Sequence, residues 1–147
     1  MNLPAQIDGL ENAALPARPV HLAIGMFDGV HLGHRAVIET AVHSARRSGG
    51  LAVVLTFWPH PSALFRPENP TRLIQDPPTK ARVLLGLGID VVVTQAFTPE
   101  LARVAAPDFL PWLRQRLPGL AAVYAGENFR FGQGRRGDAA QLLASAR

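Results

Sequence analysis

Four short, mostly apolar runs divide the chain and predict its main strands. Continuous apolar runs of this length are typical of strands that are buried on both faces of a sheet. The four runs are Val20–Ile24, Leu51–Phe57, Asp90–Thr94 and Ala121–Tyr124. The pattern therefore predicts a parallel sheet.

Amphipathic segments between these runs predict helices. His34–Arg47 places its apolar residues on one helical face, and Gly49–Gly50 after it is a typical helix stop. A further helix is predicted from near Pro107 to just before Pro118, and a last one from Asp138 onward. Because strands and helices alternate, we expect right-handed βαβ units and an α/β fold with helices on both faces of the sheet.

The segment Thr79–Leu87 predicts another helix, with Lys80 and Arg82 on its polar side. The apolar residues that its period places inside are Val83, Leu84 and Leu87. The stretch from Pro59 to Pro78 shows no clear period. A loop of that length in a compact domain is usually functional or poorly ordered.

Composition narrows the class of protein. The length of 147 residues fits one domain over residues 1–147, and the lack of cysteine excludes disulfides and thiolate-bound zinc. No apolar run is long enough to cross a bilayer, and the N-terminus lacks the pattern of a secretory signal. We therefore expect a cytoplasmic protein that does not bind a membrane.

The charge of the chain favours an anionic ligand. The formal net charge is +4, from 15 basic and 11 acidic residues, and Lys80 is the only lysine. The basic residues are spread along the chain, without a basic stripe interleaved with aromatic residues. We therefore expect no nucleic-acid partner.

The densest chemical signal is IGMFDGVHLGH at residues 24–34, which follows the first strand and opens the first helix. Ligands of open parallel sheets bind at the carboxyl ends of the strands. Gly25, Gly29 and Gly33 allow a tight turn and a close approach of the backbone to a ligand. The N–H groups and positive dipole end of the following helix suit a phosphate group.

His31 and His34 lie three residues apart at this helix start, so both imidazoles can point to one group. Two such donors would stabilise the negative charge that builds on a phosphate during its transfer. Two other interpretations stay open, a plain turn with surface or capping histidines and a metal site. No carboxylate lies at a natural ligand spacing on this helix to complete a metal site.

A second signal, TFWPHPSALF at residues 56–65, ends the second strand. Pro59 and Pro61 fix the backbone on either side of His60. A flat aromatic ligand could stack on the rings that this loop presents. Those side chains are Phe57, Trp58, His60 and Phe65. The alternative is a proline-braced turn whose aromatic residues belong to the core.

A third signal, YAGENFRFGQGRRGD at residues 124–138, ends the fourth strand. Asn128 can donate a hydrogen bond to a phosphate or to a ring carbonyl, and three arginines add positive charge. Asp138 is a suitable N-cap for the last predicted helix. The alternative is a flexible surface loop of glycine and arginine. Because the three signals end three strands of one parallel sheet, they carry more weight together than singly.

Together, GMFDGVHLGH, TFWPHPSALF and GENFRFGQGRRGD resemble the FMN adenylyltransferase module of bacterial FAD synthetases. This module is the N-terminal half of the bifunctional riboflavin kinase/FAD synthetase. The H-x-G-H element is shared with the wider nucleotidyltransferase superfamily, whereas T-F-x-P-H-P and G-E-N-F-x-F-G narrow the resemblance to the flavin enzyme. The resemblance implies a Rossmann-like nucleotidyltransferase fold.

The resemblance also implies a reaction, in which ATP and FMN give FAD and pyrophosphate with Mg²⁺. It implies that His31 and His34 are the catalytic residues, which hold the ATP phosphates and stabilise the transition state. The implied ATP-binding residues are Gly25, Phe27, Asp28, His31, Gly33, His34 and Asn128. The implied flavin-binding residues are Phe57, Pro59, His60, Pro61, Phe65, Asn128 and Phe131. No protein ligand of Mg²⁺ is evident, and we expect phosphates and water to hold this ion.

The chain departs from the family pattern at three places. Met26 stands where the family often has asparagine, and Trp58 stands where a small or acidic residue is common. The family continues past Arg147 with another strand and an I-S-S-T-x-I-R motif that binds ATP phosphates. We therefore expect a domain that is incomplete at its C-terminus, without the riboflavin kinase domain.

Three functions remain in competition, and the oligomeric state stays open. The first is an FMN adenylyltransferase, the second another H-x-G-H nucleotidyltransferase with a different product. The third is a module that binds flavin or ATP without turnover, which the missing motif favours. The P-H-P loop argues against the second.

Overall fold

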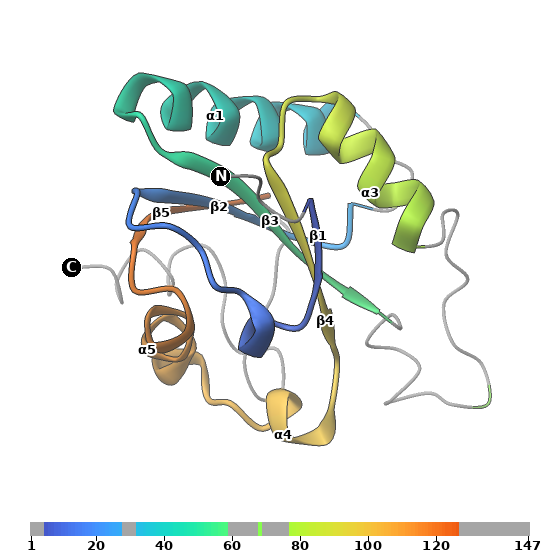
Figure 1. Cartoon of the computed structure of the whole chain (residues 1–147). Helices are drawn as coiled ribbons and strands as arrows, with labels where there is room; N and C mark the ends of the chain where they lie inside the picture. The colour runs from blue at the N-terminus through green and yellow to red at the C-terminus, as the bar shows by residue number, and fades with distance from the viewer. Residues whose placement is uncertain (1–4, 28–31, 59–67, 69–76, 127–147) are drawn as a thin grey trace.

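The computed structural model describes residues 5–27, 32–58, 68 and 77–126, which form a five-stranded parallel sheet with helices on both faces (Figure 1). The strands lie in the order β1-β4-β3-β2-β5, and every pair of neighbours is parallel. Their bounds are Gln6–Asp8 for β1, Val20–Ile24 for β2, Leu51–Trp58 for β3, Val91–Ala96 for β4 and Leu120–Ala125 for β5. This is the α/β fold that the alternating pattern predicts, and it is of the Rossmann-like type that the family resemblance implies.

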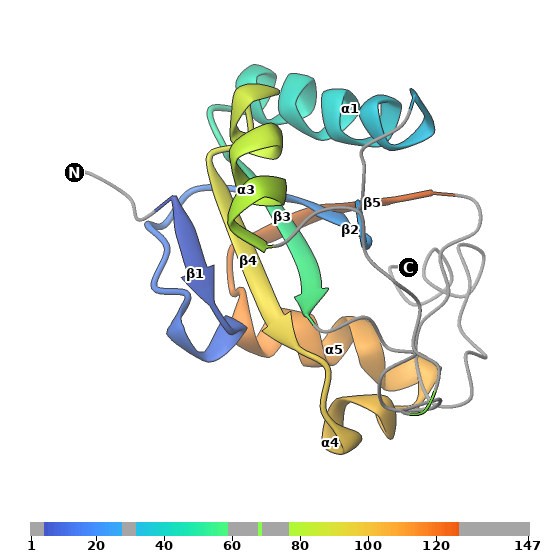
Figure 2. The same cartoon turned by 90° about the vertical axis from the view of Figure 1, so that its right-hand side faces the viewer.

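The helices form two layers around the sheet (Figure 2). On one face lie α1 (Leu32–Ser48) and α3 (Pro77–Gly86), which connect β2 to β3 and β3 to β4. On the other face lie the short helix η1 (Leu10–Asn12), α4 (Pro99–Ala102) and α5 (Ala106–Arg116). The chain therefore winds outward from β2 to β4 along one face and returns along the other face to β5.

The two faces of the sheet bury side chains of different size. Successive strand residues point to opposite faces, so each strand supplies both layers. Leu22 and Leu55 pack with α5, in a layer rich in leucine and valine. Ala23 and Ala52 pack with α1, in a layer rich in alanine. Small side chains on the α1 side allow this helix to approach the sheet closely.

The four predicted strands and three of the predicted helices are confirmed, with bounds within two residues of the prediction. The structure adds β1, η1 and α4, which have three, three and four residues and are too short to show a period. The helix predicted from Asp138 onward lies outside the described residues, as does nearly all of the loop predicted from Pro59 to Pro78.

The prediction for α3 is wrong at two residues. Lys80, predicted on the polar side, is only 1% exposed, whereas Val83, predicted inside, is 37% exposed. Leu84 is fully buried, as predicted. The first turns of α3 lie beside the ends of β2 and β3, where buried polar atoms receive the long lysine side chain.

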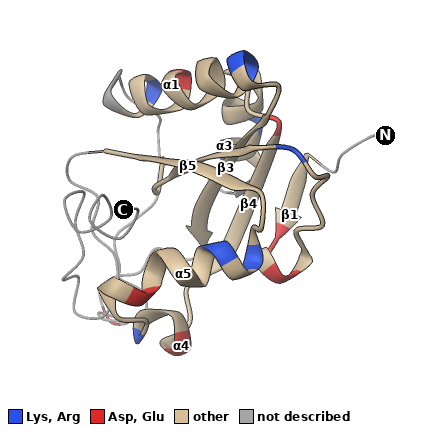
Figure 3. Ribbon diagram, turned by 90° about the vertical axis from the view of Figure 1, so that its left-hand side faces the viewer, with Lys and Arg blue, Asp and Glu red and all other residues tan. Residues whose placement is uncertain are grey.

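Charged residues lie on the helices and connections rather than on the inner strands (Figure 3). The inner strands β2, β3 and β4 have no Asp, Glu, Lys or Arg residue, as expected for strands covered on both faces. Among the described helices, none is long and apolar enough to span a membrane.

Candidate active site

The strand order defines where a ligand would bind. The chain leaves β2 for β3 on one side and returns to place β5 on the other side, so the order reverses between β2 and β5. In open parallel sheets, ligands bind outside the carboxyl ends of the strands at such a switch point. The segment after β2, residues 25–31, therefore begins at the edge where a ligand is expected.

The described part of this segment is a tight turn that packs back on the protein. The Gly25 N–H donates to the Leu55 carbonyl at 3.2 Å, which ties the turn to β3. Phe27 has a φ of 51°, in the left-handed region, and the residue is only 2% exposed. A Cβ at Gly25 would lie 3.1 Å from Cζ of Phe27, so this position favours glycine. The Phe27 ring is therefore a core group, and only its backbone is available to a ligand.

His34 stands in the first turn of α1, directly after this turn. Its ring meets the Phe27 ring edge-on, with 5.4 Å between ring centroids and 80° between planes. The first N–H groups of a helix lack partners within it, and its dipole attracts anions. The structure thus brings His34 and the start of α1 to the switch point. Gly33 lies in the same turn, whereas Asp28 and His31 lie outside the described residues.

A buried lysine completes the support of the turn, and the sequence prediction misses it. Lys80 Nζ donates to the Met26 carbonyl at 2.8 Å and to Thr56 Oγ1 at 3.0 Å. Thr56 Oγ1 also donates to the Met26 carbonyl, at 3.0 Å. The helical period places Lys80 on the exposed face of the helix, which is wrong. The one sequence signal that could have singled it out is that Lys80 is the only lysine in a chain whose other basic side chains, apart from histidines, are arginines.

The end of β3 contributes one aromatic residue to the core and one to the surface. Phe57 is 8% exposed and meets Phe97 edge-on, with ring centroids 6.1 Å apart. Trp58, the last residue of the strand, is 42% exposed. Phe57 therefore belongs largely to the core, in line with the alternative interpretation of this loop. The other predicted flavin-binding residues, Pro59, His60, Pro61, Phe65, Asn128 and Phe131, lie outside the described residues.

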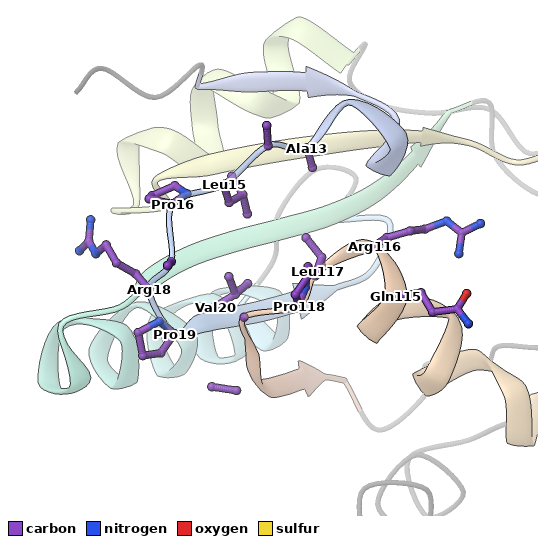
Figure 4. A pocket seen from close by; sticks show the side chains of 14 residues that line it. Ala13, Leu15, Pro16, Arg18, Pro19, Val20, Gln115, Arg116, Leu117 and Pro118 are labelled. Carbon is purple, nitrogen blue, oxygen red and sulfur yellow. The ribbon is translucent and has the colours of Figure 1, made fainter.

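A groove lies at the opposite edge of the sheet, among the amino ends of the strands (Figure 4). It has a volume of about 810 Å³ and is lined by residues 13–20, 115–119 and Ala121. Its two arginines are already engaged. Arg18 donates to the carbonyls of Gly49 and Gly50, and the Arg116 guanidinium lies 4.2 Å from the centre of the Trp112 ring. The groove is remote from the predicted ligand edge and is not part of the candidate site.

No metal ligand set is evident in the part of the chain that the structure describes. Within those residues, no group of three or more His, Asp or Glu side chains is close enough to hold an ion. The donors at the turn are His34 and the first backbone N–H groups of α1, since the Lys80 ammonium is already bonded to Met26 and Thr56.

Comparison with known proteins identifies the family of this chain. A family described as FAD synthetase matches residues 15–147. The chain is 32% identical, over 133 residues, to the bifunctional riboflavin kinase/FMN adenylyltransferase of Escherichia coli (strain K12), covering 90% of this chain and 42% of that protein. It is 37% identical, over 117 residues, to the protein of the same name from Bacillus subtilis (strain 168), covering 79% of this chain and 36% of that protein. The chain thus spans less than half the length of these relatives.

A solved structure shares the fold. The crystal structure of a macrolide-efflux protein from Streptococcus pneumoniae superposes with a TM-score of 0.81 at 24% identity, covering 97% of this chain and 47% of that one. At this identity the likeness concerns the fold alone. The family match covers nearly the whole chain, and the described residues 25–27 lie at the switch point of the sheet. The chain belongs to the FAD synthetase family.

Proposed function

We propose that the chain transfers AMP from ATP to FMN, giving FAD and pyrophosphate. The observation that carries this proposal is the turn after β2, which delivers His34 and the start of α1 to the switch point of the sheet. This is where a parallel sheet receives phosphates. Family membership and the names of the relatives support FMN as the acceptor.

The chemistry needs positioning and charge stabilisation rather than a protein nucleophile. A phosphate oxygen of FMN attacks the α-phosphorus of ATP, and the bond from that phosphorus to the oxygen that bridges the α- and β-phosphates breaks, so that pyrophosphate leaves. Negative charge builds on the oxygens around the α-phosphorus and on the leaving pyrophosphate. His34, His31 and the first N–H groups of α1 would donate to these oxygens.

Mg²⁺ would enter this site bound to the phosphates of ATP. The donors described at the turn suit phosphate oxygens, and Mg²⁺ usually keeps several waters and binds through substrate phosphates. When bound, the ion would neutralise part of the triphosphate charge. The chain's own residues would bind and orient the phosphates.

The site residues divide into two groups in this proposal. Gly25, Phe27, Asp28, His31, Gly33, His34 and Asn128 would surround ATP, with Phe27 contributing its backbone. Phe57, Pro59, His60, Pro61, Phe65, Asn128 and Phe131 would surround the flavin. Since the Phe57 ring is 8% exposed, its part in the second group is to support the loop that follows β3.

The test is FAD formation, followed by chromatography, from the purified chain with FMN, ATP and Mg²⁺. We expect FAD from the parent chain and a loss of about 100-fold or more in turnover for His34→Ala, the effect typical of removing one donor to transition-state charge. A substrate panel with other phosphate acceptors tests the other nucleotidyltransferase activities. Binding of FMN or ATP without FAD formation would overturn the proposal and support a binding module.

A further inference from the structure

The buried lysine of α3 is a feature that the proposed reaction does not yet explain. Lys80 is 1% exposed, although lysine is among the residues that are almost never fully buried without partners. Its ammonium lies within hydrogen-bond distance of two oxygens, the Met26 carbonyl and Thr56 Oγ1. Burying a charge is costly unless it is hydrogen-bonded, so these two oxygens stabilise the buried ammonium.

The partners join three segments that are far apart in the sequence. Met26 belongs to the turn after β2, Thr56 to β3 and Lys80 to α3. The Thr56 hydroxyl donates to Met26 and accepts from Lys80, so the Met26 carbonyl receives two donors at 3.0 and 2.8 Å. The motif that ends β2 and the motif that ends β3 are thus linked through one carbonyl.

This carbonyl controls the direction of the turn. The Met26 carbonyl and the Phe27 N–H belong to one peptide plane, and in a trans peptide they point in opposite directions. Lys80 and Thr56 draw the carbonyl inward, so the Phe27 N–H points away from α3. Phe27 is also the residue with a φ of 51°, a region that a residue other than glycine rarely adopts. The two hydrogen bonds are therefore made to the carbonyl directly before this uncommon conformation.

We infer that Lys80 is a positioning residue for the nucleotide turn. Its ammonium holds the Met26 carbonyl, which orients the backbone at Phe27, and it places a positive charge behind the turn that would receive the triphosphate. The identity of that ligand rests on the proposed function. The role of Lys80 in holding the turn rests on the contacts of Met26 and Thr56 alone.

The first experiment compares Lys80→Met with Arg82→Met in the full chain. Both changes replace a long cation on α3 with methionine, but the Arg82 side chain is exposed, and its guanidinium donates to Thr79 Oγ1 of the same helix at 3.3 Å. We expect Lys80→Met to raise the KM for ATP about 10- to 100-fold, the range for a lost hydrogen bond to a charged group, with little change in the KM for FMN. Arg82→Met should leave both values near those of the parent.

A second readout does not depend on turnover. Hydrogen exchange followed by mass spectrometry reports the backbone amides of residues 25–27. We expect about 10-fold or faster exchange at these amides in Lys80→Met, but not in Arg82→Met, since an opened turn exposes them. Unchanged exchange in Lys80→Met would overturn the inference. If that variant does not fold, Thr56→Val removes one of the two donors to Met26 and must show the same faster exchange.

Chemical rescue separates the charge of Lys80 from its volume. The chain has no cysteine, so Lys80→Cys provides a single thiol. Alkylation of the unfolded variant with 2-bromoethylamine, followed by refolding, restores an ammonium at nearly the length of lysine. Alkylation with 1-bromopropane gives a neutral arm of the same size. Recovery of slow exchange with the charged arm only supports the inference, whereas equal recovery with both arms overturns it.

The two proposals fail in different ways. If the parent chain forms no FAD, the proposed function fails for this chain, and the exchange of residues 25–27 still decides the role of Lys80. If the parent chain forms FAD while Lys80→Met keeps the same KM for ATP and the same exchange, the proposed function stands and the inference on Lys80 falls.

Discussion

Two buried polar side chains lie on the same face of the sheet and contribute in different ways. Lys80 is at the carboxyl ends of the strands, and its partner Met26 is in a turn. His21 is near the amino end of β2, and its partners lie in or at the end of regular elements. The Lys80 contacts thus end in a turn, whereas the His21 contacts connect β2 with β5 and α1.

The His21 network has a defined direction. Its Nδ1 lies 2.9 Å from the Tyr124 hydroxyl and its Nε2 lies 2.9 Å from Ser48 Oγ. Ser48 Oγ donates to the Ala45 carbonyl, so it accepts from His21 Nε2–H, which leaves Nδ1 to accept from Tyr124. This assignment makes the imidazole neutral, with both of its nitrogens satisfied. The three side chains connect β2, β5 and α1.

The largest expected effect is at the carboxyl edge, on catalysis. Under the proposed function, His31→Ala should lower kcat by about 100- to 1,000-fold, because it would remove a donor to charge that develops only in the transition state. FMN affinity, measured by quenching of flavin fluorescence, should change little. An equal loss of turnover and FMN affinity would mean that His31 shapes the turn, as we infer for Lys80.

An intermediate effect is expected at the other end of the sheet, on stability. Tyr124→Phe should lower the free energy of unfolding by about 1 to 3 kcal/mol, because it leaves a partly buried imidazole nitrogen without its donor. Urea unfolding followed by circular dichroism measures this change. The control is Thr40→Val, which removes an exposed hydroxyl that bonds to the Ala36 carbonyl on α1. If Thr40→Val lowers the free energy of unfolding as much as Tyr124→Phe does, the Tyr124 hydroxyl contributes no more to stability than an exposed hydroxyl.

The smallest expected effect is a pH dependence of stability. Burial lowers the pKa of His21 below its ordinary value of 6.5. The unfolded chain then binds a proton more readily than the folded chain, so the stability from the neutral imidazole is complete above about pH 6.5 and decreases as the pH falls toward the folded-state pKa.

The matched comparison for this pH dependence is His21→Gln. Unfolding free energies at pH 7.5 and about 6 should differ more for the parent chain than for the variant, since the other histidines titrate in both. Equal differences would show that the titration of His21 is not coupled to folding.

The sequence pattern predicts the regular elements of this protein but not the contacts of Lys80. The apolar runs predict the strands because a strand buried on both faces must be apolar throughout, and the period of α1 predicts its buried face. Lys80 escapes this reasoning. A helical period predicts which face of a helix is apolar. It carries no information on polar atoms of other segments, such as the Met26 carbonyl and Thr56 Oγ1, that lie against that face.

By itself, the sequence determined the alternation of strands and helices and the placement of three ligand-type segments after strands of one sheet. These are local properties, set by side-chain period and by glycine and proline. Only the tertiary structure decided that β1 joins the sheet beside β4, that Phe27 and Phe57 turn their rings into the core, and that Lys80 is buried under the turn after β2. Those outcomes depend on which strands become neighbours, and long-range packing, rather than any local pattern, selects the neighbours.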